Sequence, residues 1–124
     1  MKKFELDLSE WKVSVPVPRP TEDNPHAMGE QEQVYPFREN LNLWLRAAGV
    51  FRSGEDIAEA VVLAGRLRDA DGDSAVLDER EADILKKALN RHIEATADGK
   101  TPAMLGGPLH EQAICRVFGM KEVE

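Results

Sequence analysis

The stretch from Asp78 to Ala97 constrains the fold most, because it predicts a long helix whose two ends are both visible in the sequence. Asp78 and Glu81 have the spacing of a capping box, in which each side chain accepts a hydrogen bond from an amide of the first turn. An apolar stripe follows at three- and four-residue spacing, made by Ala82, Leu85, Leu89, His92 or Ile93, and Thr96. Asp98-Gly99 ends the helix. Because such a stripe needs covering, we expect the rest of the chain to fold around this helix.

The composition is that of a folded protein with an acidic surface. Charged residues make up 31% and apolar residues 42% of the 124 residues, which is too apolar for a disordered chain. We expect a single domain spanning residues 1–124. Sixteen basic against 23 acidic residues give a net charge of −7. We therefore do not expect direct binding of nucleic acid, which needs a surplus of positive charge on one face.

The sequence carries no signal for a membrane or for secretion. No apolar run approaches the roughly 20 residues that span a bilayer. Acidic residues soon follow Lys2 and Lys3 and interrupt the apolar region that a signal peptide needs. The one cysteine, Cys115, cannot form an internal disulfide, which is typical of a reducing compartment. We predict a cytoplasmic protein without membrane contact.

Two stretches near the N-terminus alternate between apolar and polar residues, the period of strands with one buried face. The alternating apolar residues are Phe4, Leu6 and Leu8, and then Trp11, Val13, Val15 and Val17. We expect an antiparallel hairpin that turns at Ser9-Glu10, or a three-stranded meander in which Gln33–Phe37 pairs with the second strand. Pro16 cannot donate to a sheet, so the second strand must bulge, lie at an edge or end there.

Residues 18–31 contain Pro20, Pro25 and Gly29 and show no periodicity, which predicts an exposed, mobile loop. If the third strand pairs with the second, this loop is an insertion in a hairpin. Two interpretations stay open. Long irregular loops in compact domains are often functional, whereas surface insertions are also tolerated at little cost, and we favour the second interpretation.

Three further helices are predicted, over residues 38–48, 54–68 and 109–118. Gly49 should end the first, and Ser53 with Asp56 should cap the second. The apolar residues that define their faces are Leu41, Trp44, Leu45 and Ala48, then Ile57, Ala60, Val61, Ala64 and Leu67, then Leu109, Ala113, Ile114, Val117 and Phe118. We expect residues 99–108 to form an exposed loop and residues 120–124 a frayed acidic tail. The predicted fold class is α+β, a hairpin or meander packed with about four helices.

The connection between the second and third predicted helices comes closest to a metal motif. Asp69, Asp71 and Asp73 take positions one, three and five of an EF-hand calcium loop. However, Ser74 stands where the loop needs glycine, and Arg80 stands where it needs a bidentate glutamate. The alternative is a solvated turn in which Asp and Gly serve backbone geometry. We favour the turn and predict no metal ion or cofactor.

His110 and Cys115 lie five residues apart on the last predicted helix. This offset rotates the two side chains away from each other, so they suit neither a zinc pair nor a Cys–His catalytic pair. We expect Cys115 to be a buried, inert thiol. Gly106-Gly107 before this helix is a location that can bind anions, but it lacks a nucleotide-binding motif, and a flexible elbow is the better interpretation.

No catalytic constellation stands out in the rest of the chain. A modest basic spot on the long helix is surrounded by acids and predicts a solvated face; it consists of Lys86, Lys87, Arg91 and His92. No Ser-His-Asp set and no distinct pair of carboxylates can be singled out among the scattered acids. We therefore do not expect an enzyme.

Four segments follow one another in a characteristic order. They read KFELDLSEWKVSV, RENLNLWLRAAGVF, GEDIAEAVVLAGRL and LDEREADILKKAL. This layout, over roughly residues 3–95, resembles the small accessory proteins encoded in phage and prophage morphogenesis cassettes. The resemblance implies a non-enzymatic protein that acts through contacts with virion or other phage-encoded proteins, and it transfers no functional residue.

Two functions are compatible with these features. The first is a protein-interaction or assembly module that contacts a virion or host protein through the loop 18–31 and the edge strand beside it. Trp11, Tyr35 and Trp44 are large enough to anchor such an interface, although both tryptophans fall on faces that favour the core. The second is an acidic regulator that binds a basic DNA-handling protein or mimics nucleic acid. The sequence leaves the oligomeric state open.

Overall fold

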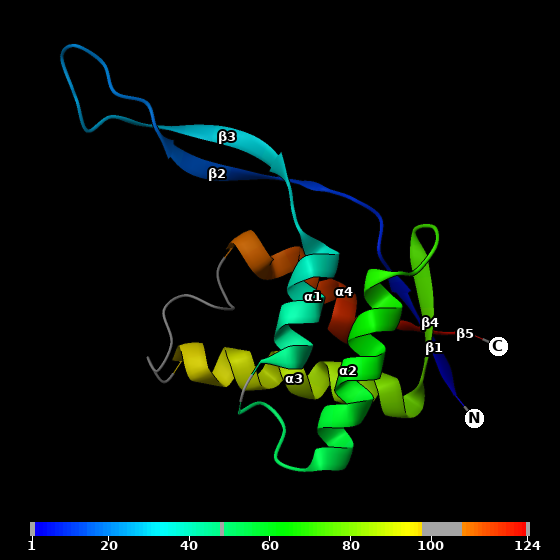
Figure 1. Cartoon of the computed structure of the whole chain (residues 1–124). Coiled ribbons are helices and arrows are strands. Elements are labelled where there is room, and N and C mark those ends of the chain that lie inside the picture. Colours follow the sequence, from blue (N-terminus) through cyan, green and yellow to red (C-terminus); the bar gives the residue numbers. More distant parts are fainter. Residues whose placement is uncertain (1, 48, 98–107, 124) are drawn as a thin grey trace.

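The computed structural model describes residues 2–47, 49–97 and 108–123, and within them the fold is α+β (Figure 1). These residues form four α-helices, one 3-10 turn and five strands, and the strands make up two antiparallel sheets. In chain order the elements are β1 Lys3–Asp7, β2 Lys12–Pro18, β3 Met28–Val34, α1 Phe37–Arg46, α2 Gly54–Arg68, β4 Ser74–Asp78, α3 Glu79–Ala97, η1 Pro108–His110, α4 Glu111–Phe118 and β5 Lys121–Val123.

The long helix α3 is where the sequence predicts it, and its capping box is confirmed. The Glu81 amide donates to Asp78 Oδ1 at 2.8 Å, and the Asp78 amide donates to Glu81 Oε1 at 3.1 Å. Along the predicted stripe Ala82, Leu85 and Leu89 are buried. Helices α1, α2 and α4 and strand β1 contact α3, so it is central to the body of the protein.

The predicted hairpin between the first two strands is wrong. Strand β1 instead lies in the middle of a three-stranded sheet of order β4-β1-β5, with Phe4 opposite Leu77 on one side and Glu122 on the other. The tail predicted to be frayed therefore contributes β5, and the connection after Asp73 contributes β4. Both partners lie far from β1 in sequence, and a short strand's own pattern does not say which strand it will join.

The antiparallel hairpin is formed by β2 and β3, with Val15 opposite Gln31. Strand β3 begins at Met28, so the connecting loop comprises residues 19–27 and not 18–31. We missed most of this strand because MGEQEQV has no apolar alternation, which a strand needs only when one of its faces is buried, and no residue of β3 is buried. Pro16 lies at the outer edge of this two-stranded sheet, one of the three places that its missing N–H allows.

Helix α2 has the predicted bounds, and the Asp56 amide donates to Ser53 Oγ at 3.1 Å as its cap predicts. Its buried face differs from the predicted one. Leu63 is fully buried, whereas Ile57 and Val61 are 49% and 38% exposed. Apolar residues surround most of α2, so the periodicity alone does not define the face that α1 and α3 cover.

The remaining helices are close to their predicted positions. Helix α1 spans residues 37–46, two residues short of the predicted end, with Leu41, Trp44 and Leu45 buried. Gly49 has φ of +82°, a backbone conformation that suits glycine after a helix. The last helix is the 3-10 turn η1 followed by α4, in which Ala113 and Val117 are buried. The predicted loop 99–108 lies outside the described residues apart from Pro108, which begins η1.

Candidate interaction surface

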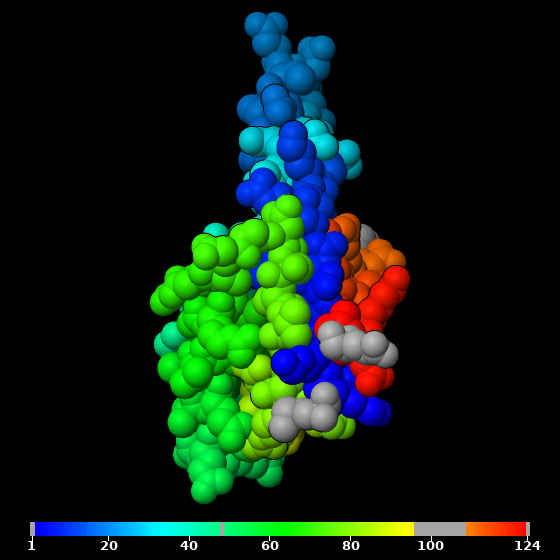
Figure 2. Space-filling view, turned by 90° about the vertical axis from the view of Figure 1, so that its right-hand side faces the viewer, coloured from blue at the N-terminus to red at the C-terminus, as the bar shows by residue number. Residues whose placement is uncertain are grey.

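The hairpin formed by residues 12–34, which we call the arm, projects from the body (Figures 1 and 2). All residues from Pro18 to His26 are exposed, and within β3 every residue except Gly29 is exposed. Of the described elements, η1 contacts β2 at the base of the arm. A two-stranded hairpin without further cover is marginally stable in water, so the arm gains little stability from the described part of the body.

The turn at the tip of the arm is held by short-range hydrogen bonds. The Arg19 amide donates to the Ala27 carbonyl at 2.8 Å, which extends the ladder beyond β2 and β3. The Thr21 amide donates to the Asn24 carbonyl at 2.9 Å, and the Asn24 amide donates back to Thr21 Oγ1 at 3.0 Å. The tip is therefore a defined tight turn formed by polar residues.

The two faces of the arm differ in chemistry. Val13, Val15 and Val17 lie on one face, where Gly29, Gln31 and Gln33 oppose them. The opposite face carries Lys12, Ser14, Pro16 and Pro18 from β2, and Met28, Glu30, Glu32 and Val34 from β3. Each valine is half-buried and each glutamate exposed, so the arm offers a partner an apolar stripe on one side and carboxylates on the other.

An aromatic cluster fixes the base of the arm. The rings of Trp11 and Tyr35 stack with centroids 4.7 Å apart, and Phe37 meets Trp11 edge-on at 5.0 Å. The Arg116 guanidinium of α4 lies 4.2 Å from the Trp11 ring centroid and donates to the Ser9 carbonyl at 2.7 Å. Tyr35 is buried and Trp11 packs against the core, so these residues hold the arm and are not exposed anchors for a partner.

A hydrogen bond between Tyr35 and His110 adds to this base. Tyr35 Oη lies 2.5 Å from His110 Nδ1, and the His110 ring meets both Tyr35 and Trp44 edge-on. Burial lowers the pKa of His110 and raises the pKa of Tyr35. Both shifts favour the neutral forms, in which the phenol donates and the imidazole accepts.

His110 also borders a hollow of about 420 Å³ beside α1. Its lining residues are Asn40, Leu43, Trp44, Arg46, Ala47, His92 and His110. Cys115 lies elsewhere: it is exposed on α4, so the prediction of a buried thiol is wrong. Ala113 and Val117 turn toward the core, and Cys115, midway between them, therefore faces outward. The lining contains neither a carboxylate nor the cysteine, so these described residues form no nucleophile–base pair.

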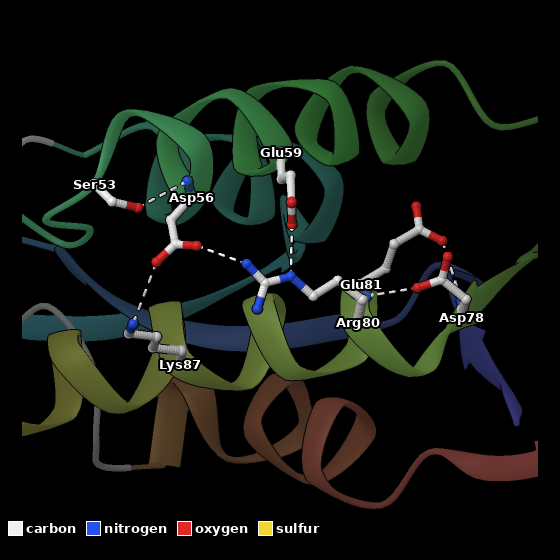
Figure 3. A network of polar contacts seen from close by, with 7 residues as sticks. All are labelled: Ser53, Asp56, Glu59, Asp78, Arg80, Glu81 and Lys87. Atoms are coloured by element: carbon white, nitrogen blue, oxygen red, sulfur yellow. Dashed lines mark hydrogen bonds and ion pairs between the residues drawn. The ribbon is translucent and has the colours of Figure 1, made fainter. Parts of the chain in front are cut away.

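A shallow groove of about 360 Å³ between α2 and α3 is the competing surface on the body. Ala58, Val62 and Ile84 line it, and charged residues form its rim. Figure 3 shows Arg80 reaching from α3 toward α2, where it donates to Glu59 at 2.7 Å and Asp56 at 2.6 Å.

Further ion pairs join the same two helices. Lys87 Nζ lies 3.6 Å from Asp56 Oδ2, and Arg66 pairs with Glu81 (Figure 3 includes Lys87, Asp56 and Glu81). Desolvation alone would raise the pKa of Asp56, but the hydrogen bond from Arg80 and the charge of Lys87 lower it below its ordinary value. The rim charges of the groove are thus already paired within the body.

The loop with Asp69, Asp71 and Asp73 is a turn that is held by contacts with Arg38 and Arg68. Arg38 of α1 donates to the carbonyls of Ala70 and Gly72, both at 2.5 Å. Gly72 has φ of +75°, and Asp69 pairs with Arg68, which lowers the pKa of Asp69. The Arg38 guanidinium therefore fixes the backbone of this loop in the conformation of a turn. Within the described part of the chain, no three His, Cys, Asp or Glu side chains are grouped so as to hold a metal ion.

The basic residues of α3 are dispersed over different partners. Lys86 lies 5.7 Å from the centroid of Phe4, Lys87 pairs with Asp56, and Arg91 lies 3.8 Å from Glu94. His92 Nε2 is 3.3 Å from the Trp44 carbonyl. These contacts leave no single positive track along α3. Gly106-Gly107 lies outside the described residues.

Sequence reasoning found the first strand of the arm and its connecting loop, and pairing of a third strand with the second was one of its two alternatives, but it placed that third strand at residues 33–37 and so missed most of β3. One feature of the sequence could have indicated an exposed hairpin. Pro16 and Pro18 lie two residues apart in β2, so the positions of both missing N–H groups face the same edge of the sheet. In the described ranges there is no helix with the length and apolarity to cross a bilayer. No family model, curated protein or solved structure matches this chain.

Proposed function

We propose that this protein is a non-enzymatic module that binds another protein through the arm of residues 12–34. The observation that carries the proposal is a 23-residue projection whose tip and carboxylate-bearing face are exposed and whose base is fixed by aromatic stacking and Arg116. An exposed hairpin without cover loses conformational freedom on folding and gains little burial in return. Contact with a partner supplies the missing burial.

The alternative surface on the body is less suited to a partner. The carboxylates of Asp56, Glu59 and Glu81 already pair with basic residues of α2 and α3. A nucleic-acid mimic or an acidic regulator of a DNA-handling protein would present unpaired clustered carboxylates to its target. Since these charges are engaged within the body, we favour the arm-based interaction over mimicry.

The resemblance in element order suggests where such a module acts. We propose a cytoplasmic accessory protein of phage or prophage type whose arm contacts a virion component during assembly. The proposal of a protein partner rests on the arm. The assignment to virion assembly rests on the layout resemblance alone.

A photo-cross-linking residue tests the proposal directly. p-Benzoylphenylalanine is placed at Met28 on the arm or, as a matched control, at Val62 on α2; these side chains are 61% and 65% exposed. We expect Met28 to yield one dominant cross-linked protein in the native host with phage genes induced, and Val62 to yield none.

Mass spectrometry of the cross-linked product decides between the candidate functions. A virion structural protein supports assembly, and a polymerase or nuclease supports the acidic-regulator alternative instead. If Val62 captures the partner and Met28 does not, the arm is not the binding surface and the proposal fails.

A further inference from the structure

The direction of the hydrogen bonds within the arm determines which backbone groups face outward. The Tyr35 amide donates to the Trp11 carbonyl and the Arg19 amide to the Ala27 carbonyl. Bonded and non-bonded pairs alternate in an antiparallel ladder, and these two pairs share one register with the hairpin. Odd-numbered residues of β2 therefore bond to β3, and even-numbered residues turn their N–H and C=O groups to the outer edge.

The outer edge of β2 is closed to further pairing. Its outward positions are Lys12, Ser14, Pro16 and Pro18, and the two prolines have no N–H to donate. Prolines at an edge are a common means of preventing addition of another strand. The same parity explains how both prolines fit in β2 without breaking the hairpin.

The outer edge of β3 is open. Its outward positions are Met28, Glu30, Glu32 and Val34, each with a backbone N–H and C=O directed away from β2. All four residues are exposed, and no proline interrupts them. The arm therefore has one edge that can accept a strand and one that cannot.

The side chains along the open edge of β3 favour a positively charged ligand. Glu30 and Glu32 project from the same face, between Met28 and Val34. Among the described residues neither carboxylate has an ion-pair partner; Glu30 accepts a hydrogen bond from Ser14 Oγ at 3.1 Å. A strand added beside β3 would place its own alternate side chains directly opposite these four residues.

We infer that the open edge of β3 binds an extended segment of a partner protein, with basic residues at two alternate positions and apolar residues beyond them. The basic side chains pair with Glu30 and Glu32, and the apolar ones pack on Met28 and Val34. Backbone hydrogen bonds supply affinity, and the alternate side chains supply specificity. This inference rests on the proposed function and names the edge and the chemistry of the ligand.

A second copy of this chain is a poor occupant of the same edge. An antiparallel two-fold pairing of β3 about Gln31 would place Glu30 of each copy opposite Glu32 of the other. If the register shifts by two residues in one direction, Glu30 of one copy lies opposite Glu30 of the other copy. A shift by two residues in the other direction places Glu32 opposite Glu32. Like charges directly opposed destabilise a sheet, so the edge disfavours self-pairing and favours a basic segment.

Two synthetic peptides of one composition provide the probe. The acetylated and amidated peptide VTKTKTV places both lysines on the face of Glu30 and Glu32, and its palindromic order allows either strand direction. The control peptide VKTTTKV moves both lysines to the opposite face. In an NMR titration we expect the first peptide to bind more tightly and to slow hydrogen exchange of the amides of Glu30, Glu32 and Val34.

Paired proline variants test the edge. Glu32→Pro removes an outward N–H from β3, whereas Ser14→Pro removes one from β2 directly across the same rung. We expect Glu32→Pro to abolish binding and Ser14→Pro to retain it. The double variant Glu30→Gln with Glu32→Gln keeps every backbone group, and we expect binding about 2- to 30-fold weaker.

Each other outcome overturns the inference. It fails if both peptides bind equally or if neither binds. It also fails if Ser14→Pro and Glu32→Pro have the same effect on binding while the NMR chemical shifts of their hairpins remain native, or if the free protein dimerises through β3. Cross-linking from Met28 to a partner would still support the proposed function in those cases. Cross-linking only from Val62 would remove the proposed function itself.

Discussion

At the scale of single residues, Arg116 and His110 connect the arm to the body. Arg116 lies over Trp11 and donates to the carbonyls of Asp7 and Ser9, at 3.2 and 2.7 Å. Its position depends on α4 packing beside the end of β1, almost the whole length of the chain away. Sequence reasoning assigned Arg116 no role, because no local sequence pattern indicates the distant residues that an arginine on a short helix will contact.

The burial of His110 predicts that the stability of the fold depends on pH. Burial lowers its pKa below the ordinary 6.5, so the folded state binds a proton more weakly than the unfolded chain. The stabilisation is therefore present above about pH 6.5 and is lost as the pH falls through the lower pKa of the folded state. We expect the melting temperature to fall between pH 7.5 and pH 5.

The variant His110→Asn isolates this contribution, because asparagine retains an acceptor and does not titrate. We expect its melting temperature to fall less than that of the wild type over the same interval. His26→Asn, in the exposed turn of the arm, serves as the control and should retain the wild-type dependence. An unchanged fall in His110→Asn would show that another group carries the effect.

At the scale of elements, the boundary between β4 and α3 is fixed by side-chain hydrogen bonds between neighbouring residues. Asp78 ends the strand and caps the helix, and Glu81 accepts a hydrogen bond from the Asp78 amide and also pairs with Arg66. The two hydrogen bonds between Asp78 and Glu81 join residues three apart, so they are encoded locally and could be predicted from sequence, whereas the pair with Arg66 could not. The buried face of α2 could not, because it depends on which helices cover it.

Loss of this cap should be measurable. We expect Asp78→Ala to lower the free energy of unfolding by about 1 kcal/mol, since the Glu81 amide loses its acceptor. Asp78→Asn should lose much less, because its side-chain oxygen can still accept. Urea denaturation of both variants is the measurement. Equal losses in the two would mean that the charge of Asp78, and not the cap, provides the stabilisation.

At the scale of the whole molecule, the arm and the body differ in how they are stabilised. The body buries leucines of α1, α2, α3, β1 and β4 in one core; they include Leu6, Leu41, Leu63, Leu77 and Leu89. The arm is held by its ladder, by hydrogen bonds of the tip and of Ser14, and by half-buried valines, and none of residues 12–34 is fully buried. Regions with few buried contacts open at lower free energy than the global transition.

We therefore expect the arm to open independently of the body. Native-state hydrogen exchange should give lower opening free energies for the amides of Val15, Val17 and Gln31 than for those of Leu85 and Leu89. The arm values should also be nearly independent of low urea concentrations, because local opening exposes little surface. Identical values and urea slopes in arm and α3 would show that the two unfold together.

The sequence by itself determined the features that depend on neighbours a few residues apart. These are the α+β class, the helices over residues 54–68 and 79–97, their side-chain caps, and the presence of strands at β1 and β2. Caps and helical stripes are formed within one or two turns, so their residues are visible together in the chain.

Only the tertiary structure decided the partners of the strands and the exposure of the arm. Strand β1 pairs with β4 and β5 across distances in sequence that no local period encodes. Most of strand β3 was missed because a strand without a buried face has no apolar alternation to detect. The candidate site depends on the same lack of a buried face, because the edge of β3 is open where nothing in the described body covers it. A sequence pattern indicates which residues of an element are buried, but it does not indicate which elements pack together.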